Sequence, residues 1–197
     1  MSNVVDKILE HEGGYQNLKE DKANKNSKGE WAGTNYGITP AVYEEEYGKA
    51  PSAEDMKGLT EKQARSIYEK RYVKPVKKNL GIPEDHPAFE QVVDMAVNHG
   101  YSGAVALVQR AAGAKVDGKA GPGTRKAIAA LDPAALNEQL VDARVAEYQR
   151  LAKSDPAKAT FLNGWLNRAE TFRGTNGKPE HQSVAMAAGS NTGPSAI

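Results

Sequence analysis

Apolar residues recur at helical spacing over most of the chain, and glycines and prolines separate the periodic segments. The first segment covers residues 4–12, where Val5 and Ile8 lie on the same helical face as Glu12. A helix here should end at Gly13, because glycine adopts the left-handed C-cap conformation without steric cost. The pattern therefore predicts a short buried helix with Glu12 in its last turn.

Boundary signals mark the later helices. Thr39 offers a capping hydroxyl before a proline at the first helical position, and Thr60 and Gln63 have the spacing of a capping box. The Lys74–Pro75 pair should end the helix that begins at Thr60, because the residue before a proline avoids the helical region. The helices predicted in this way cover residues 40–47, 60–73, 87–100, 102–113, 124–131, 132–155 and 158–172.

Three segments lack the helical period. Residues 15–33 form a polar loop rich in lysine, asparagine and glycine, and residues 34–38 have the composition of a short strand. Residues 174–197 carry almost no large apolar side chain, so we expect a disordered tail that cannot offset its own chain entropy. The chain is thus predicted to be mainly α, with a small irregular β or loop segment.

Composition narrows the functional classes. Of the 197 residues, 39% are hydrophobic and 26% are charged, which is typical of a soluble globular protein. A net charge of +1 does not favour nucleic-acid binding, and no apolar run is long enough to span a membrane. The N-terminal residues lack the pattern of a signal peptide. With four histidines, no cysteine and no HExxH pattern, we expect no metal site and no cofactor.

The position of Glu12 suggests acid chemistry. Burial disfavours an ionised carboxylate, and the negative end of the helix dipole acts in the same direction. A carboxyl group that keeps its proton near neutral pH is what a general acid requires. The alternative is an ordinary glutamate at a helix end that reaches into water.

The motif around Glu12 resembles a known family. The segment EHEGGY, then Asp21, then GTNYGIT resembles the glycoside hydrolase family 108 lysozymes, the N-acetylmuramidases of phage endolysins and related bacterial proteins. The second half is similar to the predicted peptidoglycan-binding region found behind that domain, and DGKAGPGT resembles the DGxxGPxT turn of peptidoglycan-binding modules. That turn could instead only connect two helices.

The resemblance implies an overall architecture. It predicts a lysozyme-like α+β fold, a helical bundle around a cleft. It divides the chain into a catalytic region (1–90), a helical peptidoglycan-binding region (91–173) packed against it as one globule, and the tail (174–197). The helix and loop patterns are compatible with this division.

The resemblance also implies catalytic roles. Glu12 would protonate the leaving oxygen of the glycosidic bond, Asp21 would be the ionised partner, and Thr34 would hold the attacking water. From the residues alone, Asp21 could equally be an Asx-turn aspartate that holds its loop, and Thr34 an ordinary strand residue.

The chain departs from the family pattern between these residues. Thr34 lies thirteen positions after Asp21, where the family has five, and KANKNSKGEWAG stands between them. The proline usual two places before the aspartate is Lys19. The insert could bulge outward and leave the site intact, since surface loops tolerate added length. It could also bring Trp31 to the cleft rim as a sugar-stacking platform.

Five further residues are candidates for the substrate-binding wall of the cleft. Two of them follow Thr34 directly. The other three lie in DMAVNHGY, which resembles the segment that joins the two regions of the family. Asn98 and His99 could instead only cap the end of their helix. The candidates are Asn35, Tyr36, Asn98, His99 and Tyr101.

These observations together predict a monomeric lysozyme. The expected reaction is hydrolysis of the β-1,4 bond between N-acetylmuramic acid and N-acetylglucosamine, with peptidoglycan strands as partner and neither nucleic-acid binding nor membrane insertion. As a phage lysin it would wait in the host cytoplasm until release to the cell wall. The alternatives are a lytic transglycosylase, against which Asp21 argues, and a non-catalytic wall-binding or secretion-assisting protein, which the insert favours.

Overall fold

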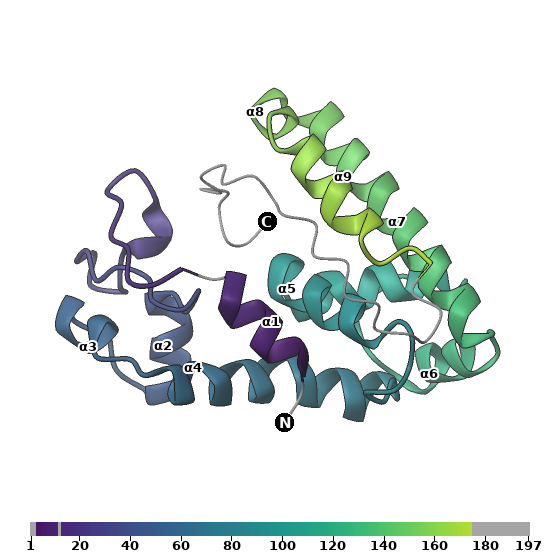
Figure 1. Ribbon diagram of the computed structural model, residues 1–197, viewed down its shortest axis with the longest axis horizontal. Helices are drawn as coiled ribbons and strands as arrows, with labels where there is room; N and C mark the ends of the chain where they lie inside the picture. The colour runs from purple at the N-terminus through teal and green to yellow at the C-terminus, as the bar shows by residue number, and fades with distance from the viewer. Residues whose placement is uncertain (1–2, 12, 175–197) are drawn as a thin grey trace. The chain divides into compact units, whose positions relative to one another are not determined.

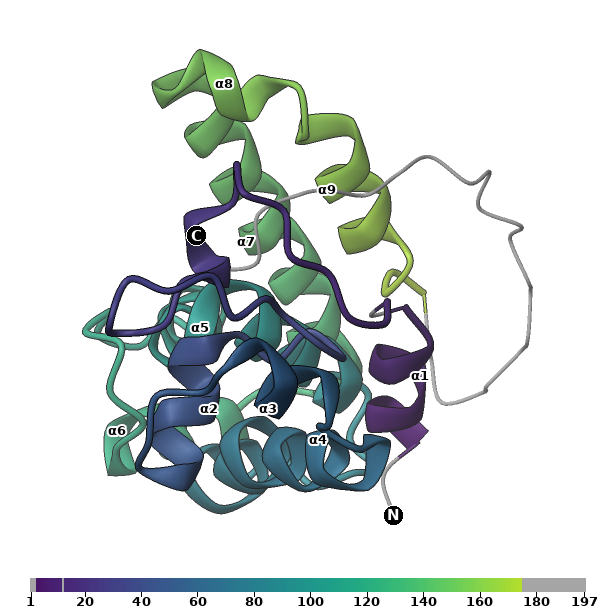
Figure 2. The ribbon, with the colours of Figure 1, turned by 90° about the vertical axis from the view of Figure 1, so that its left-hand side faces the viewer.

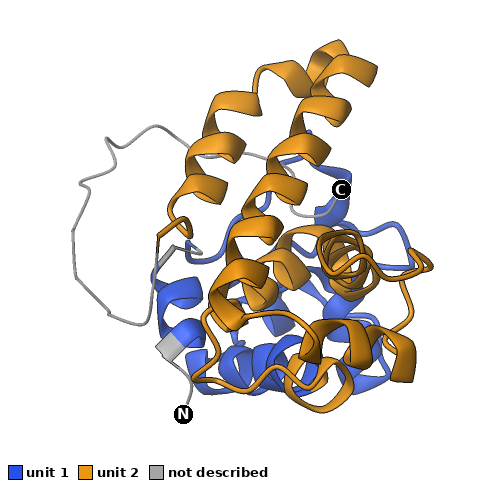
Figure 3. Cartoon of the chain, turned by 90° about the vertical axis from the view of Figure 1, so that its right-hand side faces the viewer, with its two compact units in different colours: residues 1–74, 194–197 blue, residues 75–193 orange. Residues whose placement is uncertain are grey.

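The computed structural model describes residues 3–11 and 13–174 of the chain. It divides into two compact units, one ending at Lys74 and the other beginning at Pro75 (Figure 3). The described part of each unit is mainly helical, as the sequence predicts. The predicted division at residue 90 into catalytic and binding regions remains a prediction.

Unit 1 contains short helices joined by long ordered loops. The capping box predicted for Thr60 and Gln63 is present, with Thr60 N donating to Gln63 Oε1 at 2.9 Å and Gln63 N donating to Thr60 Oγ1 at 3.3 Å. A second capping box, formed by Ser52 and Asp55, begins a helix that the apolar period did not reveal. The elements are α1 (Asn3–His11), the 3₁₀ turn η1 (Lys22–Asn24), α2 (Pro40–Tyr47), α3 (Ala53–Lys57), α4 (Glu61–Tyr68) and the π-helical η2 (Glu69–Val73).

Helix α1 packs against α4 through the apolar stripe predicted for it (Figure 2). Val5 is fully buried and Ile8 is 6% exposed, and each buried aliphatic side chain contributes about 1.5–3 kcal/mol. At the edge of this contact Asp6 pairs with Arg65 at 2.5 Å. The prediction of a short buried first helix is confirmed, and Glu12 itself lies outside the described residues.

The segment predicted as a strand, residues 34–38, contains single antiparallel bridges instead. Thr34 exchanges two backbone hydrogen bonds of 2.8 Å with Gln16, and Asn35 pairs with Ile38 around a tight turn. Gly33 precedes this contact with φ +81°, and a Cβ on it would lie 2.7 Å from both the Gln16 carbonyl oxygen and the Tyr15 ring. The Gln16–Thr34 pairing therefore requires glycine at position 33.

The prediction that Lys74–Pro75 ends a helix is wrong. Lys74 (φ −59°, ψ −43°) and Pro75 (φ −62°, ψ −38°) both have helical backbone angles. Proline normally breaks an α-helix because it lacks an N–H and its ring collides with the carbonyl four residues earlier. Here η2 precedes the pair and the π-helical η3 (Val76–Leu80) follows it, and the wider π turn shifts the hydrogen-bond register away from that carbonyl.

Unit 2 is built from longer helices. Helix α7 packs against both α5 and α9, and α7 and α9 run side by side (Figure 1). The helix predicted from residue 132 begins there, and Asp132 caps it, because its Oδ1 accepts from the amides of Ala134 and Ala135 at 3.0 Å. After η3 the elements are α5 (Phe89–Ala111), α6 (Pro122–Ala129), α7 (Pro133–Ser154), α8 (Pro156–Ala159) and α9 (Leu162–Glu170).

Helix α5 is two helices joined at Gly100. The glycine has φ +71° and ψ 158°, so the backbone leaves the helical region at the position where the sequence predicts a helix end. Ser102, at the predicted start of the second helix, donates its hydroxyl to the Gly118 carbonyl at 3.2 Å. The kink thus lies directly after the predicted site residues Asn98 and His99.

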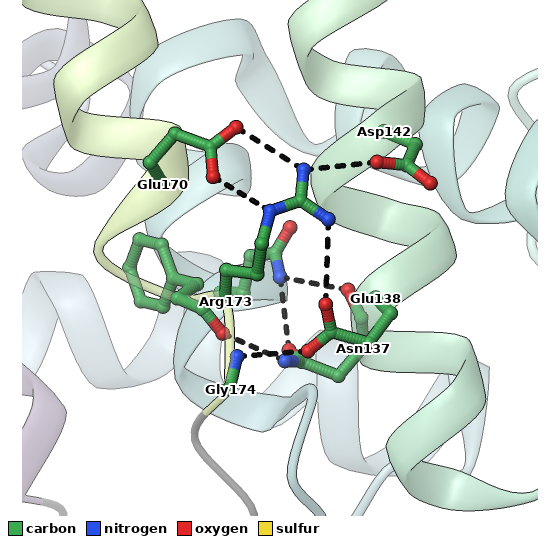
Figure 4. A network of polar contacts seen from close by, with 8 residues as sticks. Asn137, Glu138, Asp142, Glu170, Arg173 and Gly174 are labelled. Atoms are coloured by element: carbon green, nitrogen blue, oxygen red, sulfur yellow. Dashed lines mark hydrogen bonds and ion pairs between the residues drawn. The ribbon is translucent and has the colours of Figure 1, made fainter.

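The end of the described chain is tied to α7 by Arg173 (Figure 4). Its guanidinium reaches Glu170 at 2.6 Å, Asp142 at 2.9 Å and Glu138 at 3.3 Å. Below it the Asn137 amide donates to the Phe172 carbonyl at 2.7 Å. Individual exposed ion pairs contribute little, but a shared guanidinium with three carboxylates fixes the last turn after α9. The tail predicted to be disordered lies, beyond residue 174, outside the described residues.

Over residues 3–11 and 13–174, none of the helices combines the length and the apolar character needed to cross a membrane.

Substitution of Gly33 tests whether the Gln16–Thr34 pairing depends on close backbone approach. Gly29 is the matched control, because it has φ +80° but nothing within 4 Å of a Cβ built on it. Gly29→Ala should cost about 1 kcal/mol of unfolding free energy through backbone strain alone. Gly33→Ala adds a collision and should cost roughly 2–4 kcal/mol. Equal losses for the two variants in chemical denaturation would contradict this account.

Candidate active site

Asp21 caps the 3₁₀ turn η1. Its Oδ1 accepts from the Ala23 amide at 2.9 Å, and its backbone carbonyl accepts from Asn24 N at 3.0 Å. This is the Asx-turn contact expected under the structural alternative. The side chain is only partly buried, and Oδ2 has no hydrogen-bond partner among the described residues. Asp21 therefore holds its turn with one oxygen and leaves the other available.

Asn24 connects Asp21 to Thr34. The Asn24 side chain is fully buried, donates Nδ2 to the Leu18 carbonyl at 2.9 Å, and accepts from Thr34 Oγ1 at 2.7 Å. Because the η1 turn joins Asp21 to Asn24 directly, one chain of hydrogen bonds runs from Asp21 to Thr34. Two of the three predicted catalytic residues thus belong to one bonded unit despite their unusual spacing.

The insert between them folds as a small hairpin. Its backbone pairs Lys25 with Trp31, and Asn26 N donates to the Glu30 carbonyl at 2.9 Å. The Asn26 side chain closes the tip, accepting from the amides of Lys28 and Glu30 at 3.0 Å and donating to the Pro51 carbonyl at 2.9 Å. The added residues therefore leave intact the hydrogen bonds through which Asn24 connects Asp21 to Thr34.

Trp31 lies in the wall of this hairpin. Its ring is half-buried, and the Lys25 ammonium lies 4.7 Å from the ring centroid. A cation over the ring occupies a face that a sugar would need for stacking. The suggestion that Trp31 is a stacking platform therefore applies only to the opposite face.

Asn35 and Tyr36 form the turn that follows Thr34. The buried Asn35 amide donates to the Met56 carbonyl at 2.9 Å, which fixes the turn to the end of α3. Tyr36 has φ +50° and Gly37 φ +70°, and the Tyr36 carbonyl accepts from the Tyr68 hydroxyl at 3.1 Å. Within the described ranges Tyr36 alone among non-glycine residues has a positive φ. Asn35 is thus used by the fold, whereas the partly exposed ring of Tyr36 remains a binding candidate.

The three candidates in unit 2 each have a partner within that unit. The Asn98 amide donates to the Asp94 carbonyl one turn earlier at 2.6 Å, and His99 Nε2 lies 3.1 Å from the Tyr148 hydroxyl. The Tyr101 hydroxyl donates to the Pro75 carbonyl at 3.2 Å. These contacts favour the structural interpretation of Asn98 and His99 at the end of the first half of α5.

A buried charge cluster beside His99 was not anticipated from the sequence. Asp94 on α5 pairs with Arg144 on α7 at 2.5 Å and with Arg168 on α9 at 2.6 Å. Arg144 is fully buried and also donates Nε to the Tyr148 hydroxyl at 2.9 Å. One signal could have revealed it, since Arg144 interrupts the apolar stripe of Leu140 and Tyr148 at helical spacing.

The cluster sets the protonation of its members. Burial by itself would raise the pKa of Asp94, but the guanidinium groups of Arg144 and Arg168 outweigh it and hold that pKa below its usual range. Burial lowers the pKa of His99 to about 4, and the Arg144 charge acts in the same direction. His99 is therefore a neutral imidazole at pH 7, and it is suited to hydrogen bonding rather than to carrying charge.

The DGKAGPGT turn is organised by Gln109 on α5. This buried amide accepts from the backbone of Asp117 at 3.0 Å and of Gly118 at 2.9 Å, and it donates to Thr124 Oγ1 at 3.0 Å. The turn therefore has a structural role, which is to fix the start of α6. Within the part of the chain that the structure describes, no group of three or more acidic or histidine side chains could hold a metal ion.

The titration of His99 predicts a pH-dependent contribution to stability. In the unfolded chain a histidine binds a proton below about 6.5, whereas folded His99 does so only below about 4, so wild-type stability falls as the pH drops between these values. The full effect is about 3 kcal/mol. The free energy of unfolding of the wild type should therefore fall relative to that of His99→Gln between pH 7 and pH 4, by up to about 3 kcal/mol. Chemical denaturation across this range measures it, and a constant difference would refute the assignment.

Comparisons with known proteins match two consecutive parts of the chain. Residues 5–100 match the model of the glycosyl hydrolase 108 family, and residues 103–170 match the model described as a predicted peptidoglycan domain. Among solved structures, SagA of Brucella abortus is similar, with 28% identity and a TM-score of 0.69 over 86% of this chain and 89% of that one. No curated protein matches the chain in sequence. The chain thus carries a glycosyl hydrolase 108 region over residues 5–100 followed by a predicted peptidoglycan domain over residues 103–170, and these two matches support a glycoside hydrolase that acts on peptidoglycan.

Proposed function

We propose that this protein is an N-acetylmuramidase that cleaves the β-1,4 bond between N-acetylmuramic acid and N-acetylglucosamine in peptidoglycan. The observation that carries the proposal is the hydrogen-bonded unit of Asp21, Asn24 and Thr34, which lies within the family region soon after α1. Glu12 follows α1 directly in the sequence, so the proposed acid and its partner belong to the same short stretch. A peptidoglycan domain in the same chain supports the choice of polymer.

The proposed division of labour uses two carboxyl groups in different settings. Glu12 donates a proton to the glycosidic oxygen, and the developing positive charge on the sugar is met by the carboxylate of Asp21 and by water. The free Oδ2 of Asp21 is the atom available for that role, because Oδ1 is held by the Ala23 amide. Thr34 Oγ1 gives its proton to Asn24, so it faces a water only as an acceptor. We therefore propose Thr34 as a support for the site rather than as a proton donor.

A lytic transglycosylase is the second candidate, and one observation favours it. The capping contact of Asp21 gives this residue a structural role that requires no part in catalysis. A transglycosylase needs one acidic glutamate and closes the sugar's own 6-hydroxyl onto C1, so it requires no water-positioning carboxylate. Mass spectrometry of digested peptidoglycan separates the two, because hydrolysis yields reducing muramic acid ends and the alternative yields 1,6-anhydro ends.

Glu12→Gln tests the proposed acid. The amide keeps the size and polarity of the side chain but cannot deliver a proton, and general acid catalysis is worth about a hundred- to ten-thousandfold. Turnover of purified peptidoglycan should fall by at least that factor while thermal stability stays the same or rises. A variant that folds normally and keeps more than about a tenth of wild-type turnover would show that Glu12 is not the acid.

Asp21→Asn separates catalysis from capping. Asparagine is as good an N-cap as aspartate and retains the oxygen that accepts from Ala23, whereas Asp21→Ala removes both the charge and a cap worth about 1 kcal/mol. If the carboxylate serves the reaction, both variants lose activity by orders of magnitude and only Asp21→Ala loses stability. Full activity of Asp21→Asn, together with a destabilised Asp21→Ala, would reduce Asp21 to a turn residue.

A further inference from the structure

Unit 2 contains a pocket of about 310 Å³ that the proposed reaction does not use. Its volume is at the lower end of the range for small-molecule sites, roughly 300–1,000 Å³. It suits one or two small residues rather than a polymer segment. The lining is mainly apolar and comes from η3, α6 and the start of α7: Leu80, Ile128, Ala129, Leu131 and Pro133.

The pocket contains one guanidinium, that of Arg125, for which residues 3–11 and 13–174 supply no acidic partner. The other seven arginines of the chain each form an ion pair with a carboxylate. Arg125 has no carboxylate within ion-pair distance in the described residues, and its one hydrogen bond there runs from Nη1 to the Asn79 carbonyl at 3.3 Å. It therefore retains donors in the fork geometry that matches a carboxylate.

A histidine adds a second donor to the pocket. His86 Nδ1 accepts from the Ala88 amide at 3.1 Å, which places the proton of the neutral ring on Nε2. Burial lowers the pKa of His86, although Asp85 acts in the opposite direction, so the ring is neutral at pH 7. The pocket thus combines apolar walls, a guanidinium that no described carboxylate pairs with, and a neutral N–H donor.

The backbone around the pocket fixes Arg125. Gln109 anchors the DGKAGPGT turn, and this turn begins α6, on which Arg125 lies. On the other side Gly81 ends η3 with φ +72°, and a Cβ built there would lie 3.7 Å from Arg125 Cδ. The arginine stem therefore packs along a glycine, held between two ordered helix ends.

The end of a peptidoglycan stem peptide matches this chemistry. The glycan strand of peptidoglycan is neutral apart from the muramic lactyl group, which is amide-linked where a peptide is attached, whereas a peptide stem ends in a carboxylate beside a small apolar side chain. Resting on the proposed function, we propose that this pocket binds the carboxyl-terminal alanyl end of a peptidoglycan stem peptide. Arg125 pairs with the terminal carboxylate, His86 donates to the preceding carbonyl, and the apolar wall receives the methyl groups.

The test is an NMR titration of the full chain with N-acetyl-D-alanyl-D-alanine. A ligand of this size should bind with a dissociation constant in roughly the millimolar range, with shifts at Arg125, Ile128 and the start of α7. The methyl ester of the same dipeptide lacks the charge and should bind about tenfold more weakly. Arg125→Gln should weaken binding of the acid by about tenfold but leave binding of the ester unchanged.

Arg110→Gln is the matched control, because that arginine lies on α5 and is already paired with Glu147 at 3.2 Å. It should leave binding of the acid unchanged. Equal affinity for the acid and the ester, no effect of Arg125→Gln, or shifts outside the pocket would each overturn the proposal. The titration needs no glycosidase activity, so it is independent of the Glu12→Gln assay. A chain that binds the dipeptide but does not cleave glycan would refute only the muramidase proposal.

Discussion

The packing of unit 2 depends on the ion pairs of the Asp94 carboxylate. This carboxylate joins three helices, because Arg144 on α7 and Arg168 on α9 both pair with it. Arg144 is fully buried, and its Nη1 has no hydrogen-bond partner among the described residues, although the centroids of the Tyr148 and Phe172 rings lie 5.5 and 5.6 Å from the guanidinium carbon. Removing one member of such a cluster leaves a buried charge unpaired, which typically costs about 3–5 kcal/mol. The cluster therefore fixes the helix register, whatever its net contribution to stability.

Buried amide side chains fix the irregular segments in place. A loop that passes through the interior must satisfy its backbone N–H and C=O groups without a regular ladder. In unit 1 the side chains of Asn24 and Asn26 form hydrogen bonds with these backbone groups. In unit 2 Gln109 does so and holds the DGKAGPGT turn. Each of these side chains is nearly or fully buried, and each bonds to backbone groups several residues away. The sequence pattern did not identify these residues as buried, because it locates the core by apolar residues and their side chains are polar.

Local signals therefore predicted most of the helices, and long-range contacts could not be predicted. The capping residues Thr39, Thr60 and Asp132 act within one turn, so their effect can be read from neighbouring positions. The Asp94 cluster joins residues 50 and 74 positions apart, a distance over which a single sequence gives no pairing information. The prediction that a helix ends at Lys74–Pro75 was wrong for another reason. The rule that proline ends a helix assumes α geometry, whereas π turns flank Pro75 here.

The candidate site shows the same limit in a smaller space. The sequence proposed Asp21 and Thr34 as site residues and left open whether the twelve residues between them bulge outward or alter the site. In the structure that segment is a hairpin closed by Asn26, and Asn24 at its base bonds the two ends together. A general acid and its partner carboxylate must be held within a fraction of an ångström to be effective. The buried Asn24 amide holds the base of this loop as a short turn would, because the added length lies beyond Asn24. The Asp21–Thr34 spacing therefore matters less than the contact that closes it.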